Sequence, residues 1–171
     1  VLSISTEADN FFDYFDGIYV RGRTYEDAIA QGTDGGHAAN YYQGWSRPVC
    51  VEFFTTQKDK TFQEDMTVQM LDDFSITSSQ KSMQFTGNVA AGMGTGLENY
   101  YRDPEMTLTL QTHRRDNDYM TRDYLAQRLL AGTTVRSRDM QPCAVFLNGE
   151  YWGVYMLKGA YDAEFAEQAY G

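Results

Sequence analysis

Alternating apolar and polar positions indicate strands along most of the chain. Successive side chains of a strand point to opposite faces, so a period of two is typical of a sheet with one buried face. The pattern predicts strands at Val1–Thr6, Gly17–Gly22, Pro48–Thr56, Thr61–Asp72, Gln80–Thr86 and Glu105–His113. Short polar or charged turns separate most of these runs, which favours an antiparallel meander.

The best-specified element is a hairpin around Asn148-Gly149. Asn-Gly is the preferred pair for a two-residue type I′ turn, because both central residues need a positive φ. Its arms are Cys143–Leu147 and Glu150–Leu157, and both faces of the second arm are apolar or aromatic. We therefore expect the hairpin to be buried on both sides. Gly153, in the middle of the second arm, predicts either a bulge or a close backbone approach.

Apolar residues at helical spacing predict one substantial helix over Asp118–Ala131. Shorter helices are predicted at Tyr25–Ala30, with Thr24 as the N-cap, and at Tyr161–Tyr170. A run of strands with one solid helix indicates an α+β fold. We expect a mainly antiparallel sheet with that one helix packed on it.

Composition narrows the function classes. The chain has 171 residues, a size typical of one domain, and its 42% hydrophobic content can form a core. A net charge of −10 argues against a nucleic-acid partner, because phosphate neutralisation needs clustered Lys and Arg. No apolar run approaches the ~18 residues that a membrane-spanning helix needs, so none is predicted.

The cysteines and histidines do not form a metal-ligand pattern. Cys50 and Cys143 both lie in apolar, strand-like runs, where buried free thiols are the first interpretation and a cross-strand disulfide is the alternative. His37 and His113 are isolated, which argues against a structural zinc site. The glycine-rich stretch Gly92–Gly96 reads as a flexible connector, with a phosphate-binding loop as the alternative.

Several blocks of sequence resemble one known family. They are Phe11–Val20, Trp45–Phe54, the Lys-Ser pair in Ser79–Ser82, Asp116–Asp118 with Arg122-Asp123, and, most specifically, Phe146–Tyr155. Together these blocks are similar to the CotH kinase family, named for a bacterial spore-coat protein, and they span nearly the whole chain.

The resemblance implies an atypical protein-kinase-like fold that transfers phosphate from ATP, with Mg²⁺, to Ser or Thr of protein substrates. On this view residues 1–171 form a single domain that resembles the amino-terminal lobe of a kinase, with a hinge region at about 158–171. The catalytic and metal-binding acidic residues would lie in a second lobe after Gly171. The family implies an extracellular, cell-surface or spore-surface location.

The resemblance also suggests residues for a nucleotide site. Lys81 on its predicted strand is a candidate for the lysine that holds the α- and β-phosphates, in an ion pair with Asp123 of the helix. Arg122 is a second candidate cation, and Trp152 is a candidate for stacking the base. Each has a plainer alternative: a solvent-facing Lys81, an Arg122-Asp123 pair that suits the helix start, and a Trp152 that belongs to the aromatic core.

Lys158 lies where the hinge is expected, and a surface lysine is its default interpretation. The competing hypothesis for the whole chain is a non-catalytic surface or adhesion module, or a carbohydrate-binding module, of a secreted multidomain protein.

Overall fold

The structure, a computed structural model, describes residues 1–33, 35–88, 97, 105–112, 122–130, 133–135 and 140–158. The elements in chain order are β1 (Leu2–Ser5), α1 (Ala8–Phe12), α2 (Gly22–Ala30), the 3₁₀ turns η1 (Gly35–His37) and η2 (Asn40–Tyr42), β2 (Ser46–Phe54), β3 (Lys60–Met70), β4 (Met83–Asn88), β5 (Glu105–Gln111), α3 (Arg122–Leu130), β6 (Met140–Leu147) and β7 (Glu150–Lys158).

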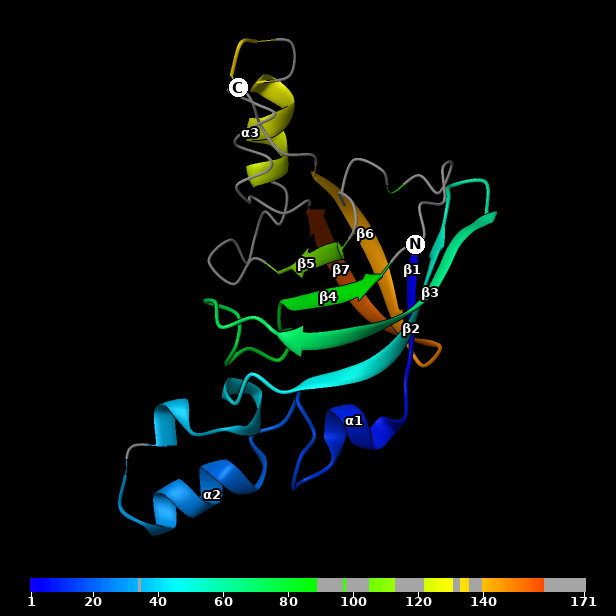
Figure 1. Cartoon of the computed structure of the whole chain (residues 1–171). Helices are drawn as coiled ribbons and strands as arrows, with labels where there is room; N and C mark the ends of the chain where they lie inside the picture. The colour runs from blue at the N-terminus through cyan, green and yellow to red at the C-terminus, as the bar shows by residue number, and fades with distance from the viewer. Residues whose placement is uncertain are drawn as a thin grey trace.

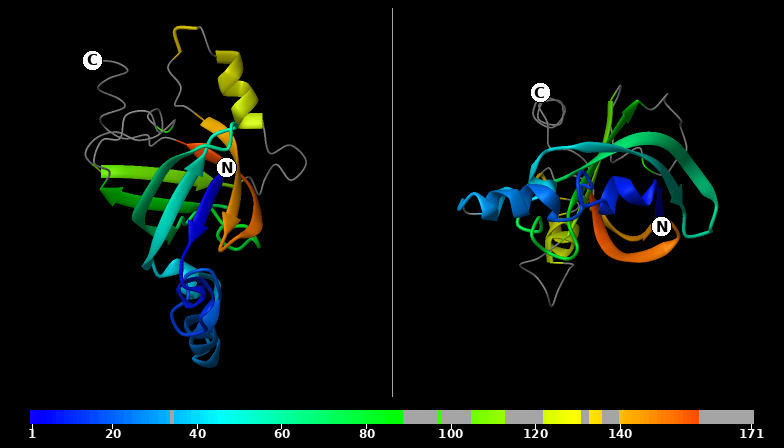
Figure 2. Two further views of the ribbon diagram at one scale, coloured as in Figure 1. Left: turned by 90° about the vertical axis from the view of Figure 1, so that its right-hand side faces the viewer. Right: turned by 90° about the horizontal axis from the view of Figure 1, so that it is seen from below.

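The strands form a closed barrel in the order β1-β2-β3-β4-β5-β7-β6 (Figures 1 and 2). Every neighbouring pair is antiparallel except β1 and β6, which run parallel. β1 closes the barrel because Leu2 is paired with Phe53 of β2 on one side and with Val145 of β6 on the other. The first strand of the chain is thus joined to the last hairpin.

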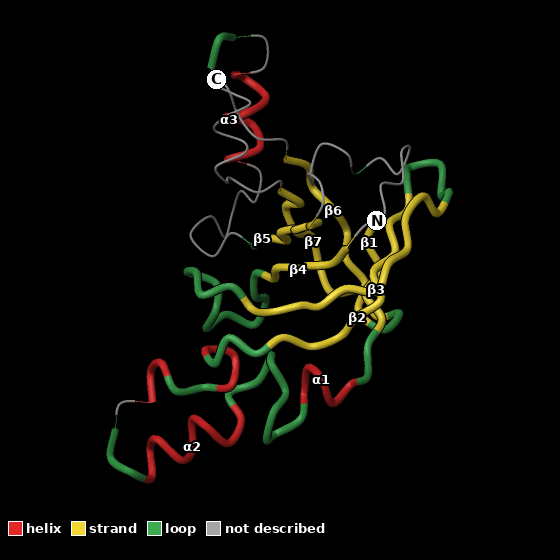
Figure 3. The backbone as a smooth tube through the Cα atoms, viewed as in Figure 1, coloured by secondary structure: helices red, strands yellow, loops and turns green. Residues whose placement is uncertain are grey.

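The expected α+β fold, with one helix packed on the sheet as in the amino-terminal lobe of a kinase, is therefore wrong. None of the side chains of α3 is buried, and Leu129 is 82% exposed. α3 lies at one end of the barrel, and α1 and α2 lie at the other (Figures 1 and 3). A sheet that closes on itself fills its inner face with its own side chains, so it needs no helix to cover that face.

The core is the interior of this barrel. Alternate residues of each strand point inward, as the period of two predicts. Fully or nearly fully buried side chains from the strands are Leu2, Ile4, Val51, Val68, Met83, Phe85, Leu108, Leu110, Val145, Tyr155 and Leu157. At about 25 cal/mol per Å² of buried apolar surface, each large aliphatic side chain contributes roughly 1.5–3 kcal/mol.

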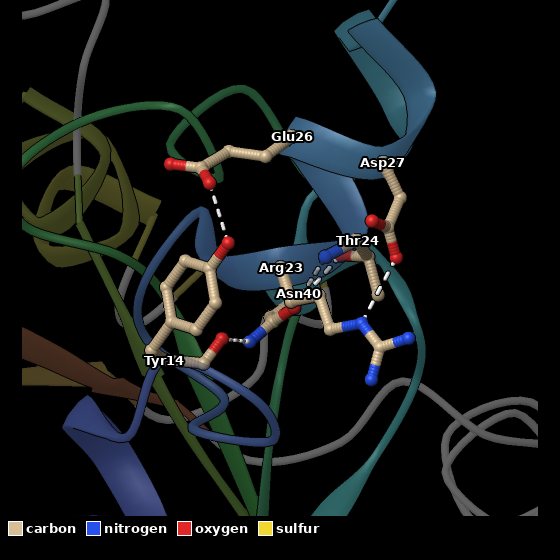
Figure 4. Close-up of polar contacts among 6 residues, drawn as sticks. All are labelled: Tyr14, Arg23, Thr24, Glu26, Asp27 and Asn40. Atoms are coloured by element: carbon tan, nitrogen blue, oxygen red, sulfur yellow. Dashed lines mark hydrogen bonds and ion pairs between the residues drawn. The ribbon is translucent and has the colours of Figure 1, made fainter. Parts of the chain in front are cut away.

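A buried asparagine organises the end of the barrel that carries α2. Asn40 is 1% exposed, and its side-chain amide donates to the Tyr14 carbonyl at 3.2 Å (Figure 4). Its side-chain oxygen accepts from the Thr24 hydroxyl at 2.7 Å. The hydroxyl of Thr24 therefore does not cap the helix as predicted, and α2 begins at Gly22, three residues before the predicted start at Tyr25.

Most strand predictions are confirmed, with boundaries shifted by a few residues, but the strand at Gly17–Gly22 is wrong. The backbone N–H groups of Ile18 and Tyr19 donate to the carbonyls of Asn10 and Phe11 in α1, and not to a neighbouring strand. Ile18 and Tyr19 are nonetheless buried. The apolar residues of this segment are therefore buried, as expected, but the segment is a loop that packs against α1 and not a strand.

The hairpin is confirmed in detail. Asn148 and Gly149 have φ values of 50° and 84°, as a type I′ turn requires. The predicted bulge is present at Gly153, as a register shift between Val145 and Phe146 on the opposite strand. Gly153 also has a φ of 125°. Burial on both sides holds only for the second half of β7, because Tyr151 near the turn is 61% exposed.

Cys50 and Cys143 are both free thiols, so the alternative of a disulfide is wrong, but of the two only Cys143 is buried. Among the described helices, none has the length and apolar character needed to cross a membrane. The predicted helix at Tyr161–Tyr170 and the stretch Gly92–Gly96 lie outside the described residues.

Candidate functional site

Two lysines are buried in the described part of the chain. Lys81 is 5% exposed and Lys158 is 2% exposed. Lysine is almost never fully buried unless its ammonium group has partners, because removing the charge from water is costly. The surroundings of each lysine therefore indicate what it does.

Lys158 lies at the end of β7, between the sheet and α3. Register places it beside Thr109 of β5 and Met140 of β6. Its ammonium donates to the side-chain oxygen of Gln111, at the end of β5. The carboxylate of Asp123, in the first turn of α3, lies 3.9 Å from the same nitrogen. Three elements thus converge on one buried cation.

The electrostatics of this cluster suit an anion. The Asp123 side chain is 48% exposed, so the cluster reaches solvent on the side of the carboxylate. Arg122, the first residue of α3, is exposed beside it. The start of a helix carries a partial positive charge, which stabilises the Asp123 carboxylate and favours further negative charge nearby. A compact ammonium and a guanidinium therefore lie beside the same helix start.

Lys81 is held in a cage of carbonyls and aromatic rings just before β4. Its ammonium donates to the carbonyls of Ile76 and Ser78, each at 2.7 Å. It also lies 4.3 Å from the ring centre of Tyr41 and 5.3 Å from that of Tyr19. These contacts fix the turn between β3 and β4 against the aromatic residues that precede β2. The alternative of a solvent-facing Lys81 is wrong.

Burial lowers the pKa of Lys81 from 10.5 to about 8, and repulsion by Arg21 contributes to the shift. Between these two pH values the unfolded chain binds more protons at this residue than the folded chain does. The free energy of unfolding should therefore rise with pH through this window, by up to about 3 kcal/mol from Lys81 alone.

Comparing the protein with its Lys81→Met variant separates this effect from those of other residues. Burial raises the pKa of Tyr19 and of Cys143, so these groups make stability fall at high pH. We expect the difference in unfolding free energy between the two proteins, measured by urea denaturation, to grow from pH 8 to pH 10.5. A constant difference would contradict the lowered pKa.

Trp152 joins the cluster of Lys81. It is the extra residue of the β7 bulge, since Val145 is paired with Gly153 and Phe146 with Tyr151. Its ring lies 5.5 Å from that of Tyr19 and 5.8 Å from that of Phe12. The ring packs against the core, as its plainer interpretation expected.

The structure thus divides the four predicted nucleotide-site residues into two pairs. Lys81 and Trp152 both contact Tyr19, whereas Asp123 and Arg122 begin α3 beside Lys158. Lys158 lies six positions after Trp152 on β7, which is about 20 Å along an extended strand. The lysine found with Asp123 is Lys158 and not Lys81.

From the sequence, Lys158 was expected at the surface, and Gln111 was not among the candidate site residues. One signal for Lys158 was available: it continues the face of Trp152, Val154 and Met156, and Met156 is buried. The partnership with Asp123 had no local signal, because it depends on where α3 lies relative to β7.

The chain belongs to the CotH kinase protein family, because the model of that family matches residues 73–171, more than half of the chain. The matched region contains both buried lysines and all of α3. Among curated proteins, no relative of the chain was found.

Proposed function

We propose that this chain provides a nucleotide-phosphate site for transfer of the γ-phosphate of ATP to Ser or Thr of a protein substrate. The observation that carries the proposal is the buried Lys158 ammonium held between Gln111 and Asp123. Membership of the CotH kinase family supports nucleotide use in general terms.

The arrangement matches a known requirement of phosphoryl transfer. Protein kinases place a strand lysine against the nucleotide phosphates and orient it with a carboxylate from a helix. Here β7 supplies the lysine and the first turn of α3 supplies the carboxylate. Gln111 accepts a hydrogen bond from Lys158 and so limits the positions of its ammonium. The Lys158 ammonium is therefore already in place before phosphate binds, so binding costs no further side-chain entropy at this residue.

Arg122 adds a second positive group in this proposal. Its guanidinium can donate two parallel hydrogen bonds to one phosphate, which a lysine cannot do. Lys81 and Trp152 do not contact the nucleotide in this proposal but stabilise the fold. A phosphate at Lys81 would have to displace the two hydrogen bonds of its ammonium to carbonyls, each at 2.7 Å. The base-stacking role of Trp152 would likewise require it to leave Tyr19 and Phe12.

The Mg²⁺ that accompanies ATP neutralises charge on the phosphates as they react. The described residues contain no group of three or more His, Cys, Asp or Glu side chains suited to a metal ion. The proposal therefore assigns Mg²⁺ no ligand among the described residues. The wider proposal includes Ser/Thr-bearing protein substrates at an extracellular, cell-surface or spore-surface location.

Nucleotide binding tests the site directly. We expect isothermal titration of Mg·ATP into the Lys158→Met variant to give a Kd about 10–100-fold higher than for the unmodified protein, because one charge-assisted phosphate contact is lost. The Asp123→Asn variant should show a smaller increase, since the lysine remains but is less well oriented.

Lys60→Met is the matched control. Lys60 lies on β3, is 44% exposed and pairs with Glu52, so its loss removes the same charge away from the site. Far-ultraviolet circular dichroism would confirm that each variant is folded. Equal Kd values for the Lys158→Met and Lys60→Met variants would contradict the proposal.

A further inference from the structure

The serine of the Lys-Ser pair belongs to a buried hydrogen-bond network that the proposed function does not use. Ser82 is 0% exposed and directly precedes β4. Its hydroxyl oxygen accepts from the backbone N–H of Thr112, which directly follows β5, at 3.0 Å. The register of β4 with β5 ends at Met83 and Leu110. The Ser82–Thr112 contact therefore joins the two strands beyond the point where their backbone pairing stops.

The carboxylate of Asp73 sets the direction of the hydrogen bonds in this network. The Ser75 hydroxyl lies 2.6 Å from that carboxylate and 2.9 Å from the Ser82 hydroxyl. A carboxylate can only accept and a hydroxyl has one proton, so Ser75 donates to Asp73. The Ser82 hydroxyl then donates to Ser75 and accepts from the Thr112 N–H. Each hydroxyl thus has both a donor and an acceptor, which fixes its orientation.

The Ser82–Thr112 contact lies next to the site of Lys158. Thr112 follows Gln111, the last residue of β5, whose side-chain oxygen accepts from the Lys158 ammonium. Thr109 of β5 is paired with Lys158, so the side chains of Gln111 and Lys158 share one face of the sheet. The end of a strand opens easily unless the next residue is held. Ser82 holds that residue and so keeps Gln111 in the sheet.

We infer that Ser82 is a positioning residue for the Lys158 site: its hydroxyl fixes the end of β5, and with it the Gln111 oxygen that holds the Lys158 ammonium. This inference rests on the proposed nucleotide site, because Ser82 acts on binding only through Lys158. The two residues of the Lys-Ser pair then have separate roles. Lys81 fixes the turn between β3 and β4, and Ser82 orders the neighbouring strand end that faces the nucleotide phosphates.

A double-mutant cycle on nucleotide binding tests this inference. We expect Ser82→Ala to raise the Kd for Mg·ATP about fivefold, measured by isothermal titration of the folded protein. In the Lys158→Met background the same substitution should leave the Kd unchanged, because the group that Ser82 positions is already absent. A purely structural role would give the same fold-change in both backgrounds. Equal fold-changes, or no change in the unmodified background, would overturn the inference.

Gly44→Ala is the control for a general loss of stability. Gly44 has a positive φ of 66° and lies just before β2, which is not a neighbour of β5 in the barrel. This variant should bind Mg·ATP with the Kd of the unmodified protein. If Ser82→Ala does not fold, Ser82→Cys keeps the size of the side chain with a sulfur that accepts only weakly. Its Kd should rise in the unmodified background alone, by a smaller factor.

The cycle also separates this inference from the proposed function. A Lys158→Met variant that binds Mg·ATP as tightly as the unmodified protein would contradict the nucleotide site itself. A raised Kd for Lys158→Met with an unchanged Kd for Ser82→Ala would overturn only the positioning role of Ser82.

Hydrogen exchange followed by nuclear magnetic resonance provides a readout without nucleotide. In Ser82→Ala the backbone N–H of Thr112 loses its acceptor, so we expect it to exchange with deuterium about tenfold faster or more. Gly44→Ala should leave this rate unchanged relative to the rates of the other strand residues. Exchange at Thr112 that is no faster in Ser82→Ala than in Gly44→Ala would overturn the inference.

Discussion

Replacing Lys81 by methionine should lower the free energy of unfolding by about 3 kcal/mol at pH 7. Methionine has a similar length, so the change leaves little empty space. It removes the donor for the carbonyls of Ile76 and Ser78, which then lie without a partner near the core. It also removes the cation that faces the rings of Tyr41 and Tyr19. Urea denaturation at pH 7 measures the loss.

The Lys60→Met variant is the control, because Lys60 is a half-exposed residue of a surface ion pair. Such pairs contribute about 0–1 kcal/mol, so its stability should change little. A Lys81→Met protein as stable as Lys60→Met would show that the buried ammonium does not fix the turn between β3 and β4.

Replacing Gly153 by alanine should destabilise the protein by about 3 kcal/mol. The φ of 125° at this position is one that residues with a side chain rarely adopt. The new Cβ would lie 2.5 Å from the amide nitrogen of Gln80 and would displace it from the Val154 carbonyl. Backbone strain and a lost hydrogen bond therefore act together. Thermal and urea unfolding both report the change.

Gly44→Ala separates these two contributions. Gly44 also has a positive φ, of 66°, but a Cβ there meets nothing within 4 Å. Its substitution should cost about 1–2 kcal/mol, from backbone conformation alone. If Gly153→Ala were no more destabilising than Gly44→Ala, the close approach of Gln80 would have no energetic weight.

Local patterns in the sequence were enough to predict the hairpin and most strands. The Asn148-Gly149 turn and the special role of Gly153 follow from φ requirements that only a few residue types meet. Closure of the barrel was not predictable in this way. It depends on pairing of β1 with β6, which are far apart in the chain. A strand has the same alternation of apolar and polar residues in an open sheet and in a closed one.

The helix prediction shows a different limit. Helical spacing identified α3 correctly, and the described part covers Arg122–Leu130. The pattern also suggested that leucines such as Leu125 and Leu129 face the sheet, yet both are exposed. Amphipathic spacing shows which residues share a helix face, but not which surface that face meets.

The candidate site was predicted in part for the same reason. The resemblance suggested an ion pair between Asp123 and a strand lysine. Lys81 was the lysine assigned to it, because Lys81 lies in the Lys-Ser block of the family. Which lysine meets the helix depends on the position of α3 beside the end of β7, and Lys158 holds that place. The buried position of Lys81 is instead explained by carbonyls and rings from segments that no local pattern connects.

The most direct test of the central claim is phosphate transfer by the longest natural form of the protein that contains this chain. The measurement follows label from [γ-³²P]ATP, with Mg²⁺, into Ser and Thr of a general protein acceptor. We predict transfer by the unmodified protein and by Lys60→Met, and a loss of about 100-fold or more for Lys158→Met. Transfer by Lys158→Met at the unmodified rate, or no transfer by the unmodified protein, would contradict the account.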